Sequence, residues 1–369
     1  MNLFASIQAS LSTFSFDPKM LLICALASLV PILGWIYFFQ KQNQEKKWYV
    51  LLTFVAGMFS VLPIKLYEKY WDSSVLYFEH INIFQYLADL VKFPEVSRFL
   101  SFISVNAIVA IGLFLFVALL MFVLEILTGD NSGRVFAHKT KIISESPFFF
   151  ATVGILCGVV AFSTSISLPK EVWFFVMVGM LEEYIKHLVT RFSDEEKIRS
   201  VDDAISFSII AALGFAFVEN IFYLQSFMAQ NEDNLRNLSF FFVLRSTVSV
   251  MAHVCFSAIL GYFYGVAKFS SEIYQEESRF KRFPIIGLFH SMIHLKKETL
   301  FHEEKMMEGM LLAMVVHAIF NSLLQFNQIA LIIPFLLIMF YMVLSLFHRK
   351  QIHSQVGNLR DMLGGTASG

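Results

Sequence analysis

Long apolar stretches alternate with short polar ones along most of the 369-residue chain. A helix that crosses a bilayer needs about 20 consecutive, mostly apolar residues, and nine stretches approach or exceed that length. They cover approximately residues 21–39, 48–66, 102–127, 148–168, 172–192, 204–225, 240–267, 308–326 and 329–347. The pattern predicts an all-α, polytopic integral membrane protein with about nine transmembrane helices. The fifth stretch is the least regular, because charged residues interrupt it.

The polar segments suggest how the chain is organised. Residues 67–100 mix aromatic and charged residues, which is typical of an amphipathic helix at the outer membrane surface. Residues 268–307 form the longest polar loop. We therefore expect an N-terminal membrane region over 1–171, a core over 172–326, and a last span with a cytoplasmic tail over 327–369.

The distribution of basic residues indicates an orientation. If the N-terminus lies outside, the cytoplasmic loops and span ends hold 19 of the 28 Lys and Arg residues. Positive charge concentrates on the cytoplasmic side of membrane proteins. We expect the N-terminus outside, the C-terminus in the cytoplasm, and an odd number of spans.

Composition agrees with a lipid environment. The chain is 57% hydrophobic and only 15% charged, whereas a soluble domain has about 25% charged residues. The net charge is −1 and no basic block dominates, which argues against a nucleic-acid partner. The partner that composition predicts is the lipid bilayer.

Ionisable residues inside the apolar stretches are unfavourable and usually mark function. Here they gather in the fifth to eighth stretches. These hold Glu182, Glu183, Lys186, Glu219, Asn220, Arg245, His253, His317 and Asn321. Their concentration predicts a polar site assembled between four neighbouring helices.

Their depth in the predicted spans refines this picture. Glu182, His253 and His317 each lie near the middle of a span, so they can meet at one level. Glu219 and Arg245 lie at similar distances from the outer ends of theirs, which predicts a buried ion pair. Such a pair is about equally well explained by helix packing alone.

These residue types suit the hydrolysis of a peptide bond. A carboxylate in a low-dielectric site is a competent general base for water, and Glu182 has that position. Lys186 follows Glu183 by three residues and Glu182 by four, so it can pair with either. His317 and Asn321 share one helix face and can donate to a developing oxyanion. His253 can share the water with Glu182 or bind a metal.

Taken singly, each residue also has a purely structural explanation. A buried His or Asn in a membrane helix commonly links two helices through a hydrogen bond. A zinc site drawn from Glu183, His253 and His317 has plausible ligand types, but the chain contains no HExxH motif. We expect a metal-free glutamate mechanism, with no cofactor, and leave zinc open.

At these residues the sequence resembles the PrsW family of intramembrane proteases, which is related to the CAAX-protease and Abi superfamily. The resemblance covers about residues 172–326. It comprises Glu182-Glu183-x-x-Lys186, Gly214-Phe215-Ala216-Phe217-Val218-Glu219-Asn220, Arg245-Ser246, His253-x-x-x-Ser257 and His317-x-x-x-Asn321. CAAX-type enzymes carry a His where this chain has Glu219, so processing of prenylated substrates is not implied.

The resemblance implies an intramembrane endopeptidase in a bacterial inner membrane that cleaves membrane-anchored proteins, such as anti-sigma factors. It implies that Glu182 and Glu183 are catalytic and that Glu219, Asn220 and His253 form the site. By analogy with CAAX-type enzymes, His317 and Asn321 would serve the oxyanion. A non-enzymatic scaffold or immunity protein of the same fold is the main alternative. A proton- or ion-coupled transporter fits less well, because the two halves of the chain show no repeat.

Overall fold

Every regular element that the structure describes is a helix, which confirms the all-α class. The computed structural model describes residues 18–40, 47–79, 94–128, 170–194, 198–230, 242–326 and 328–364. Its helices are α2 (Pro18–Gln40), α3 (Lys47–Glu79), α5 (Pro94–Thr128), α8 (Lys170–Asp194), α9 (Val201–Gln230), the π-helix η2 (Arg245–Ser249), α11 (Val250–Lys268), α12 (Ser270–Glu277), α13 (Pro284–Ile293), α14 (Lys297–Gln325) and α15 (Ile329–Gly364).

Six of these helices are long and apolar enough to cross a bilayer, and the protein is an integral membrane protein. The six candidate spans lie in α2, α3, α9, η2–α11, α14 and α15. In the described part of α5, Ile108–Leu124 forms a shorter apolar helix. The expected span at 148–168 lies outside the described residues. The count of nine is therefore not confirmed.

The fifth expected span, 172–192, forms a helix but is not among the six candidates. Its helix, α8, carries Glu182, Glu183 and Lys186 in one turn, and further charges stand at its two ends. These charges lower its mean hydropathy below that of the helices that contain the six candidate spans. Its place in the molecule is set by packing on α14 and α3.

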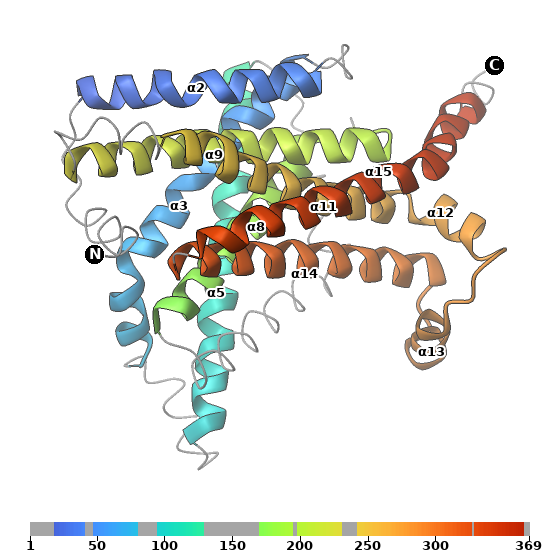
Figure 1. The fold of residues 1–369 in the computed structure, drawn as a ribbon. Coiled ribbons are helices and arrows are strands. Elements are labelled where there is room, and N and C mark those ends of the chain that lie inside the picture. Colours follow the sequence, from blue (N-terminus) through green and yellow to red (C-terminus); the bar gives the residue numbers. More distant parts are fainter. Residues whose placement is uncertain are drawn as a thin grey trace.

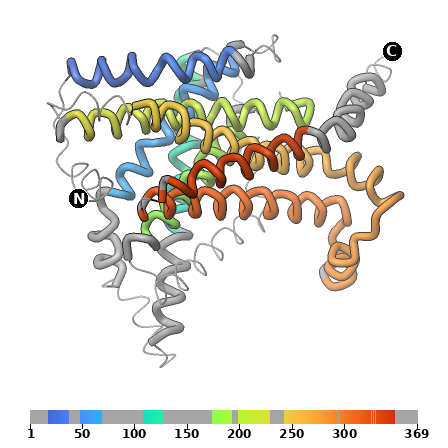
Figure 2. Tube along the Cα trace, viewed as in Figure 1, coloured from blue at the N-terminus to red at the C-terminus, as the bar shows by residue number. Residues whose placement is uncertain are grey.

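Helix α9 lies at the centre of the bundle and packs most extensively on α11 and α3 (Figures 1 and 2). Figure 1 shows α2, α9, α11, α14 and α15 running in similar directions, with α3 and α5 crossing them steeply. The α3–α9 crossing is close enough to require glycine on both helices. A Cβ on Gly214 would clash with the carbonyl oxygen of Phe54, and one on Gly57 with that of Ala211.

Several helices extend beyond the predicted spans. Helix α3 continues to Glu79, through the first part of the segment we expected to be a separate amphipathic helix. Helix α14 begins at Lys297, eleven residues before the predicted start at 308. Hydropathy locates the part of a helix that suits lipid, whereas the hydrogen bonding of a helix continues into water.

Candidate active site

One turn of α8 carries the charged side chains that organise the site. Glu182, Glu183 and Lys186 are all buried. The Lys186 ammonium lies 2.8 Å from Glu183 Oε1 and 3.5 Å from Glu182 Oε2. It also lies 4.5 Å from the centre of the Phe215 ring on α9, close enough for a cation–π contact. Helical spacing predicted that Lys186 pairs with one of the two carboxylates, and it lies close to both.

His253 on α11 joins this turn to α9. Its Nδ1 atom lies 2.9 Å from Lys186 Nζ, and its Nε2 atom lies 3.0 Å from Glu219 Oε2. An ammonium can only donate, so Nδ1 accepts from Lys186 and the ring proton sits on Nε2, which donates to Glu219. Both nitrogens of His253 are therefore engaged.

His317 on α14 contacts both glutamates. Its Nδ1 atom donates to Glu183 Oε1 at 2.7 Å. Its Nε2 atom faces Glu182 Oε2 at 3.4 Å. When the imidazole is neutral and Glu182 is ionised, these two facing atoms are both acceptors. A proton or a cation between them would stabilise the arrangement.

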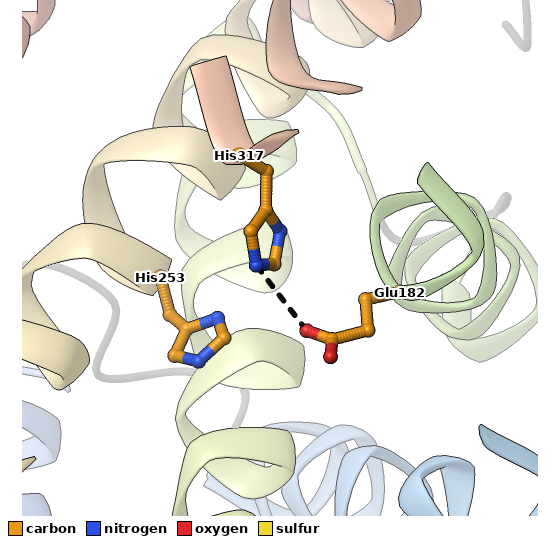
Figure 3. A group of neighbouring side chains, drawn as sticks. All are labelled: Glu182, His253 and His317. Atoms are coloured by element: carbon orange, nitrogen blue, oxygen red, sulfur yellow. Dashed lines mark ion pairs between the residues drawn. The ribbon is translucent and has the colours of Figure 1, made fainter. Parts of the chain in front are cut away.

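Glu182, His253 and His317 thus meet at one point, as their depth in the predicted spans suggested. One ligand atom from each lies within 4.8 Å of the other two. Figure 3 shows the three side chains converging from α8, α11 and α14. The His253 and His317 rings are 5.4 Å apart, in an edge-to-face arrangement.

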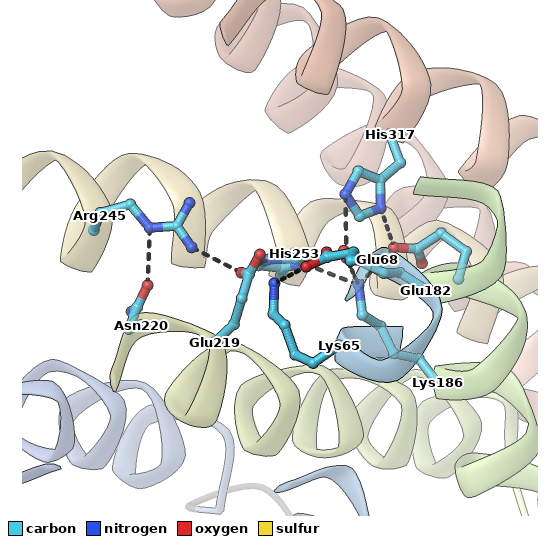
Figure 4. Close-up of polar contacts among 10 residues, drawn as sticks. Lys65, Glu68, Glu182, Lys186, Glu219, Asn220, Arg245, His253 and His317 are labelled. Atoms are coloured by element: carbon cyan, nitrogen blue, oxygen red, sulfur yellow. Dashed lines mark hydrogen bonds and ion pairs between the residues drawn. The ribbon is translucent and has the colours of Figure 1, made fainter. Parts of the chain in front are cut away.

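The predicted ion pair between Glu219 and Arg245 is confirmed. Arg245 NH2 lies 2.9 Å from Glu219 Oε2, the same oxygen that accepts from His253 (Figure 4). Arg245 Nε donates to Asn220 Oδ1 at 3.2 Å. The guanidinium also stacks 4.0 Å from the centre of the Tyr223 ring. Glu219 and Asn220 therefore hold Arg245, and Glu219 also orients His253.

A π-helical turn carries Arg245 and leads into the helix that carries His253. Residues Arg245–Ser249 form η2, which runs directly into α11. A π turn holds one more residue than an α turn and is frequent at functional sites. Arg245, Ser249 and His253, each four residues from the next, all line the same cavity. The sequence pattern did not predict this turn.

That cavity has about 40 Å³ of water-accessible volume. A buried water needs on the order of 10–15 Å³ measured in this way, so a few waters fit. Its lining residues are Glu68, Phe175, Val178, Glu182, Glu219, Tyr223, Arg245, Ser249, His253, His317, Phe320, Asn321 and Leu324. Glu183 and Asn220 contact these residues but do not line the cavity.

Asn321 reaches the cavity where α8 and α14 approach each other closely. Its Nδ2 atom donates to the Phe175 carbonyl at 3.4 Å, which is a weak bond. A Cβ on Gly179 would lie 3.2 Å from Asn321 Nδ2 and 3.3 Å from His317 Cδ2. The absence of a side chain at Gly179 therefore lets His317 and Asn321 pack closely against α8.

The sequence analysis missed a contribution from α3. Glu68 lines the cavity, and Lys65 Nζ lies 2.7 Å from Glu68 Oε2. Lys65 also lies 5.1 Å from the centre of the Tyr223 ring. The available signal was the i, i+3 pair of opposite charges next to an apolar stretch. The predicted span ends at residue 66, so Glu68 falls in the segment that we expect at the outer surface.

Comparison with known proteins indicates the family of this chain. Residues 104–347 match the family model described as PrsW family intramembrane metalloprotease. The chain belongs to this family. The matched segment contains α8, α9, η2, α11 and α14, and therefore every predicted site residue. Helices α2 and α3 lie outside it.

Three relatives, each named Protease PrsW, match parts of the chain. The protein from Geobacillus kaustophilus (strain HTA426) is 34% identical over 98 residues, covering 26% of this chain and 39% of its own length. The protein from Clostridioides difficile (strain 630) is 28% identical over 195 residues, covering 50% and 68%. That from Oceanobacillus iheyensis is 26% identical over 181 residues, covering 48% and 66%. No solved structure matches the chain.

The family's description as metalloproteases raises the question of a metal ion. Two imidazoles and a carboxylate are the ligands of one common type of catalytic zinc site, and Glu182, His253 and His317 supply them. His317 also donates its other ring N–H to a carboxylate, as zinc-bound histidines commonly do. His253 would have to release Lys186 or Glu219 to bind. The three side chains fit a metal ion by type and proximity.

This group of three differs from the zinc ligands suggested by the sequence in one residue. Glu182 takes the place that the sequence analysis gave to Glu183. In the structure Glu183 Oε1 is bonded to Lys186 and to Nδ1 of His317. Glu183 is therefore placed to orient a ligand.

Proposed function

We propose that this protein is an intramembrane endopeptidase that hydrolyses peptide bonds of membrane-anchored proteins. The observation that carries the proposal is the meeting of Glu182, His253 and His317 at a cavity large enough for water. Membership of a family of intramembrane metalloproteases supports it. The relatives named as proteases match only part of this chain. The proposal assigns their activity to the whole chain.

Glu182 is the general base of the proposed reaction. Its carboxylate takes a proton from a water in the cavity while the water oxygen attacks the carbonyl carbon of the substrate. Collapse of the tetrahedral intermediate breaks the C–N bond, and the proton held by Glu182 passes to the leaving nitrogen. Glu183 keeps His317 oriented, and Lys186 balances the charge of both carboxylates.

The developing oxyanion needs donors inside the cavity. The Asn321 amide has only a weak hydrogen bond to give up, and a protonated His317 presents its Nε2–H toward Glu182. His253 is held by Glu219 and Lys186 beside the water position. Glu219, Asn220 and Arg245 act by positioning that imidazole and the π turn.

A zinc ion held by Glu182, His253 and His317 would supply a water of lowered pKa and a Lewis acid for the carbonyl oxygen. Elemental analysis of the purified protein, followed by chelation, tests for it. Stoichiometric zinc whose removal stops cleavage would replace the metal-free mechanism that we favour. Full activity in a metal-free preparation would support the glutamate mechanism.

We also propose that the N-terminus lies outside and the C-terminus in the cytoplasm of a bacterial inner membrane. The asymmetry of Lys and Arg among the loops supports this orientation. Helix α8 then crosses the bilayer with the other core helices. The charges of Glu182, Glu183 and Lys186 are tolerated there because these buried side chains pair with one another.

The test of the proposed function is the Glu182→Gln variant of the full chain. Wild type and variant are reconstituted in vesicles with a single-span reporter protein, and cleavage is followed on gels. Loss of a general base lowers the rate by about 10²–10⁴-fold. Glu308→Gln is the matched control, because Glu308 pairs with Lys305 on the exposed surface of α14. A Glu182→Gln variant as active as Glu308→Gln would remove Glu182 as the base.

A further inference from the structure

Helix α3 contributes a wall to the catalytic cavity from outside the segment that matches the family. The match begins at residue 104, whereas Glu68 lines the cavity together with Glu182, His253 and His317. Figure 4 shows Lys65 and Glu68 among the ionic side chains of the site. Glu68 is mostly buried, with 14% of its side chain exposed.

A substrate in this cavity needs hydrogen-bond acceptors. In an α-helix each backbone N–H is bonded to the carbonyl four residues earlier, and a peptide segment must leave that conformation to expose a bond to attack. Its N–H groups then lose their partners in surroundings that hold little water. An unsatisfied N–H is strongly unfavourable there, so the site must replace the lost acceptors.

Most of the cavity lining cannot do this. Phe175, Val178, Phe320 and Leu324 have apolar side chains. The Oε2 atom of Glu219 is already ion-paired with Arg245 and accepts from His253. Glu182 is needed for the reaction itself.

Glu68 is a charged acceptor that the chemistry does not use. Lys65 binds its Oε2 atom at 2.7 Å. The other oxygen, Oε1, has no hydrogen-bond partner among the residues that the structure describes. A carboxylate held in this way forms stronger hydrogen bonds with N–H groups than a neutral acceptor does.

We propose that Glu68 is a substrate-binding residue that accepts hydrogen bonds from backbone N–H groups of the extended segment beside the scissile bond. The inference rests on the proposed function. It assigns to α3 a role in recognising unwound backbone. Lys65 is a positioning residue that holds the Glu68 carboxylate at the cavity.

Kinetics of the full chain in vesicles give the first test. Removing a hydrogen bond to a charged group weakens an interaction by about 10–100-fold. Glu68→Ala is therefore expected to raise KM by on the order of tenfold, with little change in kcat. Glu68→Gln keeps an acceptor oxygen and should lie between wild type and Glu68→Ala. Glu308→Gln, which also alters an i, i+3 Lys–Glu pair, should leave KM unchanged.

Lys65→Met separates substrate binding from a structural role of the ion pair. That variant removes the pair but keeps Glu68, so it should raise KM less than Glu68→Ala does. Equal effects of Lys65→Met and Glu68→Ala, or a fall in kcat with KM unchanged, would overturn the proposal. If Glu68→Ala does not fold, Glu68→Gln and Lys65→Met are compared in its place.

A binding measurement makes the test independent of catalysis. A fluorescent single-span peptide is bound to the Glu182→Gln protein in lipid nanodiscs, and its backbone N–H groups are replaced one at a time by ester oxygens. At one or two positions the ester should weaken binding to Glu182→Gln but not to Glu182→Gln/Glu68→Ala. Identical ester profiles for the two proteins would refute the role of Glu68. An ester profile that depends on Glu68, with no cleavage of any reporter by wild type, would instead refute the peptidase activity.

Discussion

Helices α2 and α9 are both apolar enough to cross a membrane, yet they have opposite places in the molecule. In the 18-residue apolar window of α2 only 17% of the residues are buried, whereas in that of α9 the share is 89%. Leu26 and Val30 of α2 are exposed, as suits a lipid-facing helix. Helix α9 carries Glu219 and Asn220, both buried.

The difference shows what separates the core of this protein from its periphery. Lipid is as apolar as leucine, so hydrophobicity does not bring membrane helices together. Close backbone approach and polar contacts do, and α9 has both, at Gly214 and at Glu219. Buried charge and small residues therefore mark the core, which is also where the site lies.

The largest loss of stability is expected when the ion pair between Glu219 on α9 and Arg245 on η2 is broken. Reversing one partner, as in Arg245→Glu, leaves like charges buried and is expected to destabilise the protein by about 3–5 kcal/mol. Thermal unfolding of detergent-purified protein measures the effect. The swap Glu219→Arg/Arg245→Glu should recover part of this stability, but not activity, because His253 also needs Glu219. A swap as unstable as the single reversals would show that the two residues do not simply pair.

A smaller loss of stability is expected where α3 and α9 cross at Gly214. Gly214→Ala places a methyl group against the α3 backbone, and overpacking of this kind costs about 1–3 kcal/mol. Gly34→Ala on α2 is the control, since nothing lies within 4 Å of its added Cβ. The two variants are compared by their unfolding temperatures. Equal stability of both would contradict the close α3–α9 contact.

The smallest effect is expected on the lipid-facing side. Leu26→Ala removes apolar surface from a side chain that is 57% exposed. Exposed substitutions usually change stability by less than about 0.5 kcal/mol. The same unfolding assay applies, with reporter cleavage as a second readout. A loss comparable to that of Gly214→Ala would mean that this face of α2 is covered.

Much of this organisation was readable from the sequence. The four helices of the site were identified by charged residues in apolar stretches, because buried charge is rare without a function. The Glu219–Arg245 pair followed from equal depth, and the two Lys186 contacts followed from helical spacing. The meeting of Glu182, His253 and His317 followed from their mid-span positions.

Other features depend on tertiary structure and could not be predicted. The π turn at Arg245–Ser249 leaves no mark in hydropathy, although two of its residues face the cavity. Glu68 was missed because hydropathy ended the second span two residues before it, while α3 continues. The separate positions of Glu182 and Glu183 depend on how α14 packs against α8, and helical spacing alone does not fix that.

The central claim is that Glu182 and His317 act together on one substrate in one cavity. Cleavage rates of wild type, Glu182→Gln, His317→Gln and the double variant test it most directly. Residues that act as a unit are strongly non-additive, so the double variant should be about as slow as the slower single variant. A double variant slowed by the product of the two single effects would show that the residues act independently, and would contradict the account.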